Sequence, residues 1–194
     1  TKNILFMNNF ITMNYDRNIV TNSEVSTVYK DSELNEYIFQ ENVLTGFIKN
    51  VDYPELSNEE VSQASFKSKI ASYKTRVPNY RALANTTAQS ILPVGVDLND
   101  YTLVRENFVE SYQEYSYNYV KMIGNYITND SVTVNIDING QVTSVLTTDI
   151  GEFDSIEVTD INDTMVENFV NTQMLNLHGN NVEYTIESKE IAKY

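Results

Sequence analysis

Carboxylates are the side chains in this sequence best able to do acid–base chemistry, because Asp and Glu together number 27. Glu106, Glu110 and Glu114 recur at every fourth position, which would place them on one face of a helix. A glycoside hydrolase needs two carboxylates facing each other across a cleft at a defined separation. The regular spacing is more typical of a solvated helix face, so a carboxylate-based hydrolase is the least favoured of three functions considered.

Nucleophilic catalysis would depend on the only histidine, His178, which stands beside Gly179. No G-x-S-x-G or comparable nucleophile motif accompanies it. A histidine near the end of a helix more often interacts with the last carbonyl groups than acts as a base. The sequence therefore predicts no catalytic residue and no enzyme activity.

Metal and phosphate sites are also poorly represented. The stretch 137–141, DINGQ, resembles the start of a calcium loop, but its twelfth position is Thr148 instead of Glu. Asp160, Asn162 and Asp163 are oxygen-rich, and capping of a following helix accounts for them. Neither G-x-G-x-x-G nor a Walker pattern occurs. We expect no metal and no cofactor.

Composition restricts the partners and the location that we expect for this protein. The net charge of −14 opposes specific binding to nucleic acid, since phosphate contacts need clustered Lys and Arg. The chain has no cysteine, which excludes disulfides and thiolate metal sites. No apolar run reaches the length of a membrane span, and no secretory signal is evident. These features suit a virion protein, or alternatively an extracellular or cell-surface protein.

The element expected to organise the fold runs over residues 101–127. Projected at 100° per residue, its large apolar side chains gather on one stripe and its charged side chains on the other, which predicts a long amphipathic helix. Tyr117 is the exception, because it falls on the polar face, where we expect it to be exposed. The stripe consists of Val104, Phe108, Tyr112, Tyr115, Tyr119, Met122, Ile123 and Tyr126.

After this helix the apolar period changes from 3.6 to 2. Alternation on both sides of Asn139-Gly140 predicts a hairpin over 131–148 with a type I′ turn, pairing Val134 with Val145 and Ile136 with Thr143. The further expected elements are a strand at 155–159, a helix at 164–176 that opens with a Thr164/Glu167 capping box, and a strand at 181–188.

The first half is predicted to be mostly helical after an extended start. The expected elements are an extended arm over 3–12, a loop over 14–22, a strand over 24–30, a helix over 34–48 with a strand at 37–39 as its alternative, a linker at 50–56, a helix from the Ser57/Glu60 capping box to Tyr73, and a short helix or extended loop over 81–91.

The fold class is therefore α+β: a long helix packed on a small antiparallel sheet. Residues 1–56 form an N-terminal arm or lobe, and 57–194 the core.

Three functions follow from these features. The leading hypothesis is a non-enzymatic structural or assembly subunit, most plausibly of a bacteriophage tail, neck or baseplate, that forms a homo-oligomer or part of a larger assembly. Its expected interface residues are Ile4, Phe6, Phe10 and Tyr117, since an extended arm without a partner strand would pair with a neighbour. The alternative is a surface or conjugation-associated domain of a low-GC bacterium that binds a partner or glycan, and the hydrolase comes third.

Overall fold

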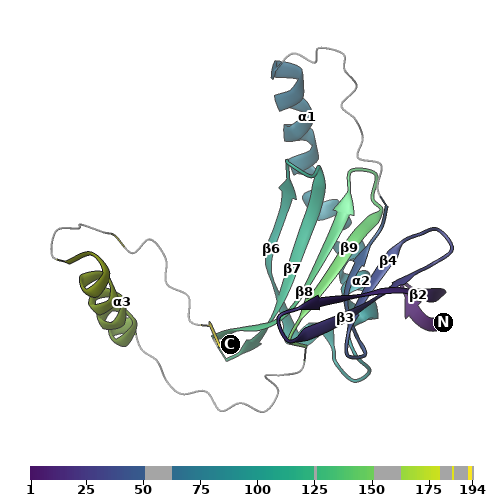
Figure 1. The fold of residues 1–194 in the computed structure, drawn as a ribbon. Coiled ribbons are helices and arrows are strands. Elements are labelled where there is room, and N and C mark those ends of the chain that lie inside the picture. The colour runs from purple at the N-terminus through teal and green to yellow at the C-terminus, as the bar shows by residue number, and fades with distance from the viewer. Residues whose placement is uncertain (51–62, 125, 151–162, 180–184, 186–191, 194) are drawn as a thin grey trace.

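The computed structural model describes residues 1–50, 63–124, 126–150, 163–179, 185 and 192–193, and its centre is one antiparallel sheet (Figure 1). Nine strands follow the order β1-β2-β3-β4-β5-β9-β8-β7-β6, and a short β10 lies parallel to β8 at Ile127 and Thr128. The strands are β1 (Lys2–Phe6), β2 (Asn9–Thr21), β3 (Glu24–Lys30), β4 (Glu36–Gln40), β5 (Val43–Ile48), β6 (Tyr101–Val109), β7 (Glu114–Ile123), β8 (Tyr126–Asp137), β9 (Val142–Thr148) and β10 (Ala192–Lys193).

The sheet contains strands from two distant parts of the sequence. Strand β5 pairs antiparallel with β9, through Phe47 opposite Val145. The strands before residue 50 and those after residue 100 therefore belong to one sheet, and the boundary expected at 56/57 falls outside the described residues.

Helices cover one face of this sheet. They are α1 (Gln63–Thr75), the 3-10 helix η1 (Val77–Tyr80) and α2 (Arg81–Ile91), with a second 3-10 turn η2 (Leu98–Asp100) leading into β6. Helix α2 buries its small residues Ala84, Thr87 and Ala88, which allow it to pack closely on the sheet. Opposite them the sheet contributes a buried row of Val132, Val134 and Ile136 from β8.

A third helix, α3 (Asp163–His178), has no buried residue, and Met165, Phe169 and Leu177 on it are exposed. It confirms the helix predicted over 164–176. None of the described helices combines the length and apolar content needed to cross a membrane.

The predicted fold class is wrong, because residues 101–127 form β6, β7 and the start of β8 instead of one long helix. The cause lies in the side chains themselves. Tyr115, Tyr117 and Tyr119 alternate with Ser116 and Asn118, a period of 2 that favours a strand, and all three tyrosines are buried. Tyr, Phe and Val also have strand propensity, whereas Ala and Leu are scarce in this stretch.

The extended start is a hairpin instead of a free arm. Strand β1 pairs with the first part of β2, from Lys2 opposite Met13 to Phe6 opposite Asn9. Met7 and Asn8 between them both have positive φ, 49° and 63°, as a type I′ turn requires. The loop expected over 14–22 is also wrong, because β2 continues to Thr21.

The hairpin predicted over 131–148 is confirmed, and so is the pairing of Val134 with Val145. The turn type is not. Asn139 does not have positive φ whereas Gly140 has φ 83°, and Asp137 N donates to the carbonyl of Gln141 at 2.8 Å. This pattern fits a three-residue loop that ends in a glycine bulge, so Ile136 lies opposite Val142 instead of Thr143.

Among the other expected elements, the strand over 24–30 is confirmed as β3, and residues 81–91 form a helix. The helix expected over 34–48 is wrong: its alternative, a strand at 37–39, holds as part of β4, and residues 43–48 form the unpredicted strand β5. Helix α1 confirms the last part of the helix expected up to Tyr73. The remaining predictions lie outside the described residues, namely the linker at 50–56, the Ser57/Glu60 capping box, and the strands at 155–159 and, apart from Thr185, at 181–188.

Candidate binding pocket and open strand edge

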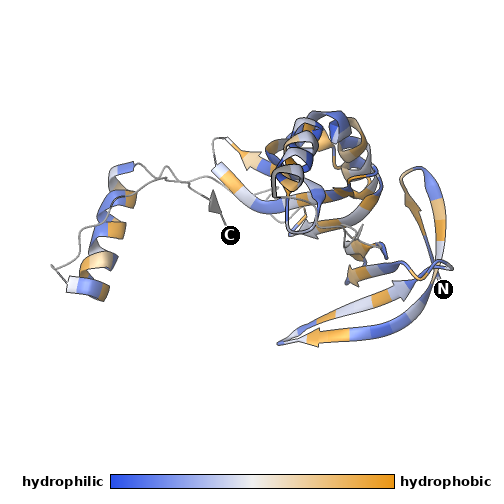
Figure 2. Cartoon of the chain, turned by 90° about the horizontal axis from the view of Figure 1, so that it is seen from above, coloured by the Kyte–Doolittle hydropathy of each residue, from blue (hydrophilic) through white to orange (hydrophobic). Residues whose placement is uncertain are grey.

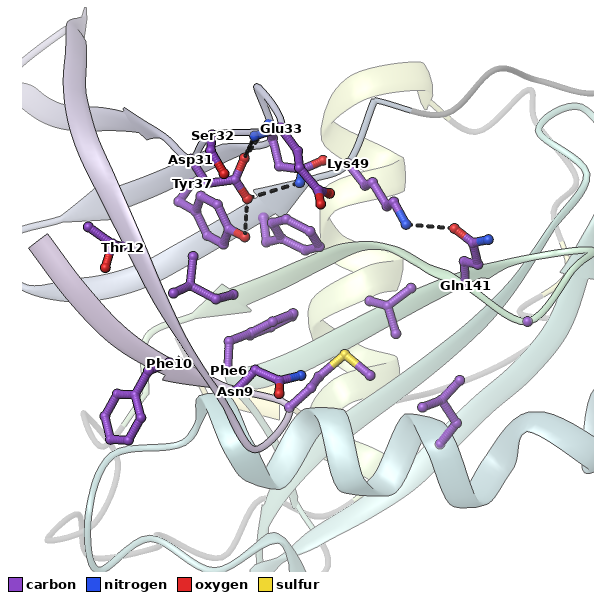
Figure 3. A pocket seen from close by; sticks show the side chains of 17 residues that line it. Phe6, Asn9, Phe10, Thr12, Asp31, Ser32, Glu33, Tyr37, Lys49 and Gln141 are labelled. Carbon is purple, nitrogen blue, oxygen red and sulfur yellow. Dashed lines mark hydrogen bonds between the residues drawn. The ribbon is translucent and has the colours of Figure 1, made fainter.

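A pocket of about 610 Å³ opens between the β1–β2 hairpin, the β3–β4 loop and the β8–β9 turn (Figure 3). The volume is within the range typical of small-molecule sites. Its lining comes from parts of the chain more than 100 residues apart, which the continuous sheet brings together. The described residues that line it are Phe6, Met7, Asn9, Phe10, Ile11, Thr12, Asp31, Ser32, Glu33, Asn35, Tyr37, Phe47, Lys49, Leu83, Gly140, Gln141 and Val142.

Three aromatic rings form the floor of this pocket. Tyr37 stacks on Phe47 with ring centroids 4.7 Å apart, and Phe6 lies against Phe47 at 4.9 Å. Each of the three is less than 5% exposed. The β1–β2 hairpin is therefore held onto the sheet by Phe6, and little of the ring faces remains open to a ligand.

One wall of the pocket is fixed by the carboxylate of Asp31. Its Oδ1 accepts hydrogen bonds from the backbone N–H of Glu33 (2.9 Å) and Asn35 (3.0 Å), and its Oδ2 accepts from Asn35 Nδ2 (2.9 Å) and the Tyr37 hydroxyl (3.0 Å). Burial alone would raise the pKa of Asp31, but these donors, led by Asn35, hold it below the usual value. Burial, aided by the charge of Asp31, raises the pKa of Tyr37.

Beside this wall lies Lys49, the only cationic side chain among the described residues that line the pocket, because its neighbour Ile48 pairs with Glu36 next to the loop over 31–35. Its Nζ donates to the side-chain oxygen of Gln141 at 2.6 Å, and its backbone N–H donates to the Thr143 carbonyl at 2.7 Å (Figure 3). No described carboxylate lies within ion-pair distance of that ammonium group. Lys49 is thus positioned at the mouth of the pocket by a neutral partner.

A second candidate surface is the hairpin formed by β2 and β3. Residues 14–21 of β2 pair with β3 on one side, whereas β1 pairs only with residues 9–13 on the other. Among the described residues, no strand covers the outer edge of Asn14–Thr21. Strand β4 extends along β3 only to Ser26, so the end of the hairpin projects beyond the sheet.

The projecting end carries apolar side chains in solvent. Val20 and Val25 lie opposite each other on the two strands and are 66% and 50% exposed. Ile19 beside them is also exposed. Seen from above, the β2–β3 hairpin lies apart from the helices, and hydrophobic positions are interspersed along it (Figure 2).

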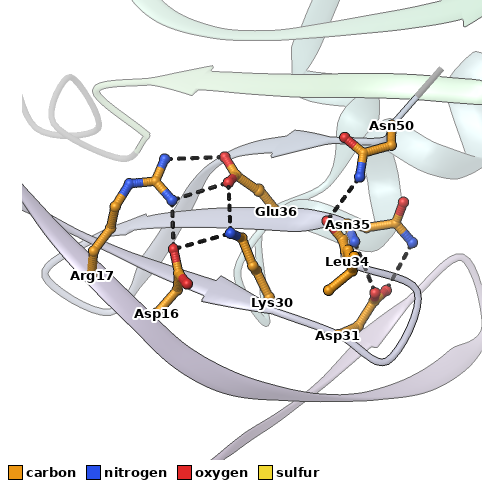
Figure 4. A network of polar contacts seen from close by, with 8 residues as sticks. All are labelled: Asp16, Arg17, Lys30, Asp31, Leu34, Asn35, Glu36 and Asn50. Atoms are coloured by element: carbon orange, nitrogen blue, oxygen red, sulfur yellow. Dashed lines mark hydrogen bonds and ion pairs between the residues drawn. The ribbon is translucent and has the colours of Figure 1, made fainter. Parts of the chain in front are cut away.

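Charge is balanced at the base of this hairpin (Figure 4). Arg17 lies 2.5 Å from Asp16 and 3.0 Å from Glu36, and Lys30 lies 3.3 Å and 3.4 Å from the same two carboxylates. Hydrogen bonds from Arg17, the largest effect, lower the pKa of both carboxylates, so Asp16 and Glu36 stay ionised at neutral pH. Residues 14–30 include two acids, Asp16 and Glu24, and two bases, so this segment is neutral in a chain of net charge −14.

The residues predicted to form an interface occupy different environments. Phe6 is buried in the core, Ile4 is partly buried against it, and Phe10 is 84% exposed at the rim of the pocket (Figure 3). The expected exposure of Tyr117 is wrong, since this side chain is fully buried. Its hydroxyl donates to the Val77 carbonyl and so ties η1 to the sheet.

The carboxylates considered for catalysis are dispersed or paired with bases. Glu106 on β6 pairs with Arg81, Glu110 in the following turn pairs with Lys74 at 2.5 Å, and Glu114 begins β7. In the described part of the chain, no group of three acidic, histidine or cysteine residues has an arrangement that could hold a metal. Asp137, from the calcium-like stretch, instead accepts from the backbone N–H groups of Asn139 and Gln141 at 2.9 Å each and so shapes the turn.

The pocket and the open edge could not be found from the sequence. Pocket residues Phe6, Lys49, Leu83 and Gln141 come from four separate segments. Pairing of β5 with β9 brings Lys49 to Gln141, and packing of α2 on β1 and β8 adds Leu83. Residues 14–21 of β2 are all exposed and mostly polar, which is why residues 14–22 resembled a loop. One available signal was that Val20 and Val25 stand at equal distances from Asn22-Ser23, as facing positions of a hairpin with a two-residue turn do.

No protein-family model, curated protein or solved structure gives a significant match to this chain.

Proposed function

We propose that this chain is a non-enzymatic assembly subunit that joins copies of itself through the outer edge of β2. The observation that carries the proposal is the open edge at Asn14–Thr21. An unpaired strand edge presents backbone N–H and C=O groups that another strand can satisfy by addition. The N-terminal arm expected to serve this purpose is folded back as β1, and the open edge is that of β2.

Side chains near the edge favour association over isolation. Natural edges are usually protected by charged side chains or bulges. Strand β2 has an irregularity between Tyr15 and Arg17, but beyond it the sequence Asn18–Thr21 carries no charge. Burial of Val20 and Val25 by a second copy would remove apolar surface from water, at roughly 25 cal/mol per Å².

Electrostatics single out the same surface. Two copies with net charge −14 repel each other over most of their surfaces. Residues 14–30 are neutral, so contact at this hairpin meets less repulsion than contact at an average position. A bacteriophage tail, neck or baseplate is the setting we propose for such an assembly, and its support is the acidic, cysteine-free composition.

The test is the molar mass in solution of the unmodified chain and of two matched variants. Light scattering over a range of concentrations should give a multiple of 22.2 kDa for the unmodified chain. Val20→Lys places a charge at the open edge and should shift the population to monomer. Val94→Lys makes the same change at a fully exposed position outside the hairpin and should leave the mass unchanged.

Either of two results would defeat the proposal. One is a monomer at every concentration of the unmodified chain. The other is an oligomer that Val20→Lys and Val94→Lys affect equally, since the contact would then lie elsewhere.

A further inference from the structure

We propose that the pocket between the β1–β2 hairpin and the β8–β9 turn binds a small apolar molecule that carries one carboxylate, with Lys49 as the residue that recognises the charge. This binding site is independent of the open edge of β2 and goes beyond the assembly role. Its lining combines a group of apolar side chains with polar ones, of which one is a cation, and an amphiphilic acid needs both an apolar surface and a cation (Figure 3).

The apolar part of the site is built from side chains that are only partly covered. Met7 and Ile11 from the β1–β2 hairpin and Leu83 from α2 are half-buried, and they face the space above the aromatic floor. An aliphatic or aromatic body placed there would contact all three and exclude water from them. The floor itself is closed, since Phe6, Tyr37 and Phe47 have almost no exposed surface, which argues against a sugar stacked on a ring.

The polar part of the site depends on how Lys49 is held. An ammonium group has three donors, and the hydrogen bond from Lys49 Nζ to the neutral side-chain oxygen of Gln141, at 2.6 Å, uses one of them. Two donors therefore remain for a ligand. No carboxylate of the described residues lies within ion-pair distance of Lys49. A ligand carboxylate would supply such a partner.

The acids at the rim restrict the charge of the ligand. The Asp31 carboxylate faces four donors of its own loop, and its hydrogen bonds leave it no role in holding a base. It and Glu33 nevertheless add negative charge around the mouth. A single ammonium can offset one carboxylate there, whereas a phosphate or a polyanion would meet repulsion. A monocarboxylate is thus favoured over a phosphorylated ligand.

Three eight-carbon probes of equal length but different charge test this inference: octanoate, 1-octanol and octylammonium. Titration calorimetry below the micelle-forming concentration should show one octanoate per chain and weaker binding of the other two. Amide chemical shifts at Gly140 and Gln141 should move during the titration, which would place the probe in this pocket. Octylammonium that binds as tightly as octanoate, or no binding of octanoate at all, would overturn the proposal.

Variants separate the role of the charge from that of the cavity. Lys49→Met should weaken octanoate binding about tenfold or more and change 1-octanol binding less than about twofold, because only the charge-assisted contact is lost. Lys69→Met, on the exposed face of α1, should change neither. Leu83→Trp, which fills the space, should reduce the binding of both probes. If Lys49→Met binds octanoate like the unmodified chain, Lys49 is not the recognising residue and the proposal fails.

Discussion

At the scale of single residues, three buried tyrosines of β7 differ in the hydrogen bonding of their hydroxyl groups. The Tyr117 hydroxyl donates to the Val77 carbonyl, and the Tyr119 hydroxyl donates to Asn85 Oδ1 at 2.6 Å. The buried hydroxyl of Tyr115 has no hydrogen-bond partner among the described residues. A buried hydroxyl without a hydrogen-bond partner lowers the stability of the fold. When one partner of a buried hydrogen bond is removed, the other group stays buried and unpaired, and this also lowers stability.

The same substitution should therefore have opposite effects at two positions on one strand. Tyr117→Phe should lower the free energy of unfolding by about 1–2 kcal/mol, because it leaves the Val77 carbonyl unpaired. Tyr115→Phe should leave the free energy of unfolding unchanged or raise it. Urea denaturation of both variants measures the difference, and equal losses at the two positions would contradict the hydrogen-bond assignment.

The buried tyrosines also predict a loss of stability at high pH. Burial, together with the charge of Glu106, raises the pKa of Tyr119 to about 12, and burial raises the pKa of Tyr115 and Tyr117 as well. In the unfolded chain these tyrosine hydroxyls ionise at about pH 10. Above that pH the unfolded state has released protons that the folded state still holds, so stability falls as pH rises.

Two measurements check this direction. The urea midpoint should be constant from about pH 7 to 9 and should fall between about pH 10 and 12, the interval between the unfolded and folded pKa values. Phenolate absorbance should show one set of tyrosines that ionises freely and a second that ionises only as the chain unfolds. A urea midpoint independent of pH up to 12 would contradict the burial of these hydroxyls.

At the scale of elements, the β8–β9 turn is defined by contact with the helical layer. Gly140 has φ 83°, and a Cβ atom added to it would lie 2.8 Å from Cε1 of Tyr80. Tyr80 in turn packs on Tyr115, with ring centroids 4.8 Å apart. The glycine thus meets two requirements at once: a left-handed backbone and close approach of η1.

A matched pair of glycines separates these two requirements. Gly95 has φ 93° with nothing within 4 Å of an added Cβ atom. Gly95→Ala should cost about 1–2 kcal/mol from backbone strain alone. Gly140→Ala should cost a further 1–3 kcal/mol or so, because Tyr80 must move within a packed layer. Thermal or urea unfolding of both variants gives the comparison, and equal costs would show that Tyr80 yields freely.

Elements also show which sequence signals were reliable. The hairpin at 131–148 was predictable because its alternation and its Asn-Gly turn are local. Residues 101–127 were misassigned because their apolar residues are dense enough to fit both periods, and strand pairing with β8 selected the period of 2. Tyr117 marked the error: it did not fit the helical stripe, but it fits the strand row with Tyr115 and Tyr119.

At the scale of the whole molecule, pairing of β5 with β9 joins two runs of antiparallel strands, β1 to β5 and β6 to β9, into one sheet and places the first 50 residues beside β9. Pairing of β5 with β9 cannot be inferred from local sequence, since about 100 residues separate Phe47 from Val145. The pocket at this junction could for that reason not be predicted from the sequence, whereas the open edge of β2 arises because β1 pairs with residues 9–13 only. The composition did indicate a strongly acidic chain. The β2–β3 hairpin differs from the rest of the chain because its own net charge is zero.

The absence of cysteine allows the central claim, self-assembly through β2, to be tested residue by residue. Single cysteines placed in turn at residues 14–21 provide the only thiol in each variant, and Val94→Cys serves as the control. Paired antiparallel strands bring facing Cα atoms to about 4.5–5.5 Å, within reach of a disulfide. Mild oxidation followed by electrophoresis should give a covalent dimer most strongly at one or two neighbouring positions of this range, where the symmetry axis crosses the strand. Dimer yields at residues 14–21 no higher than that of Val94→Cys would show that copies of this chain do not meet at this edge.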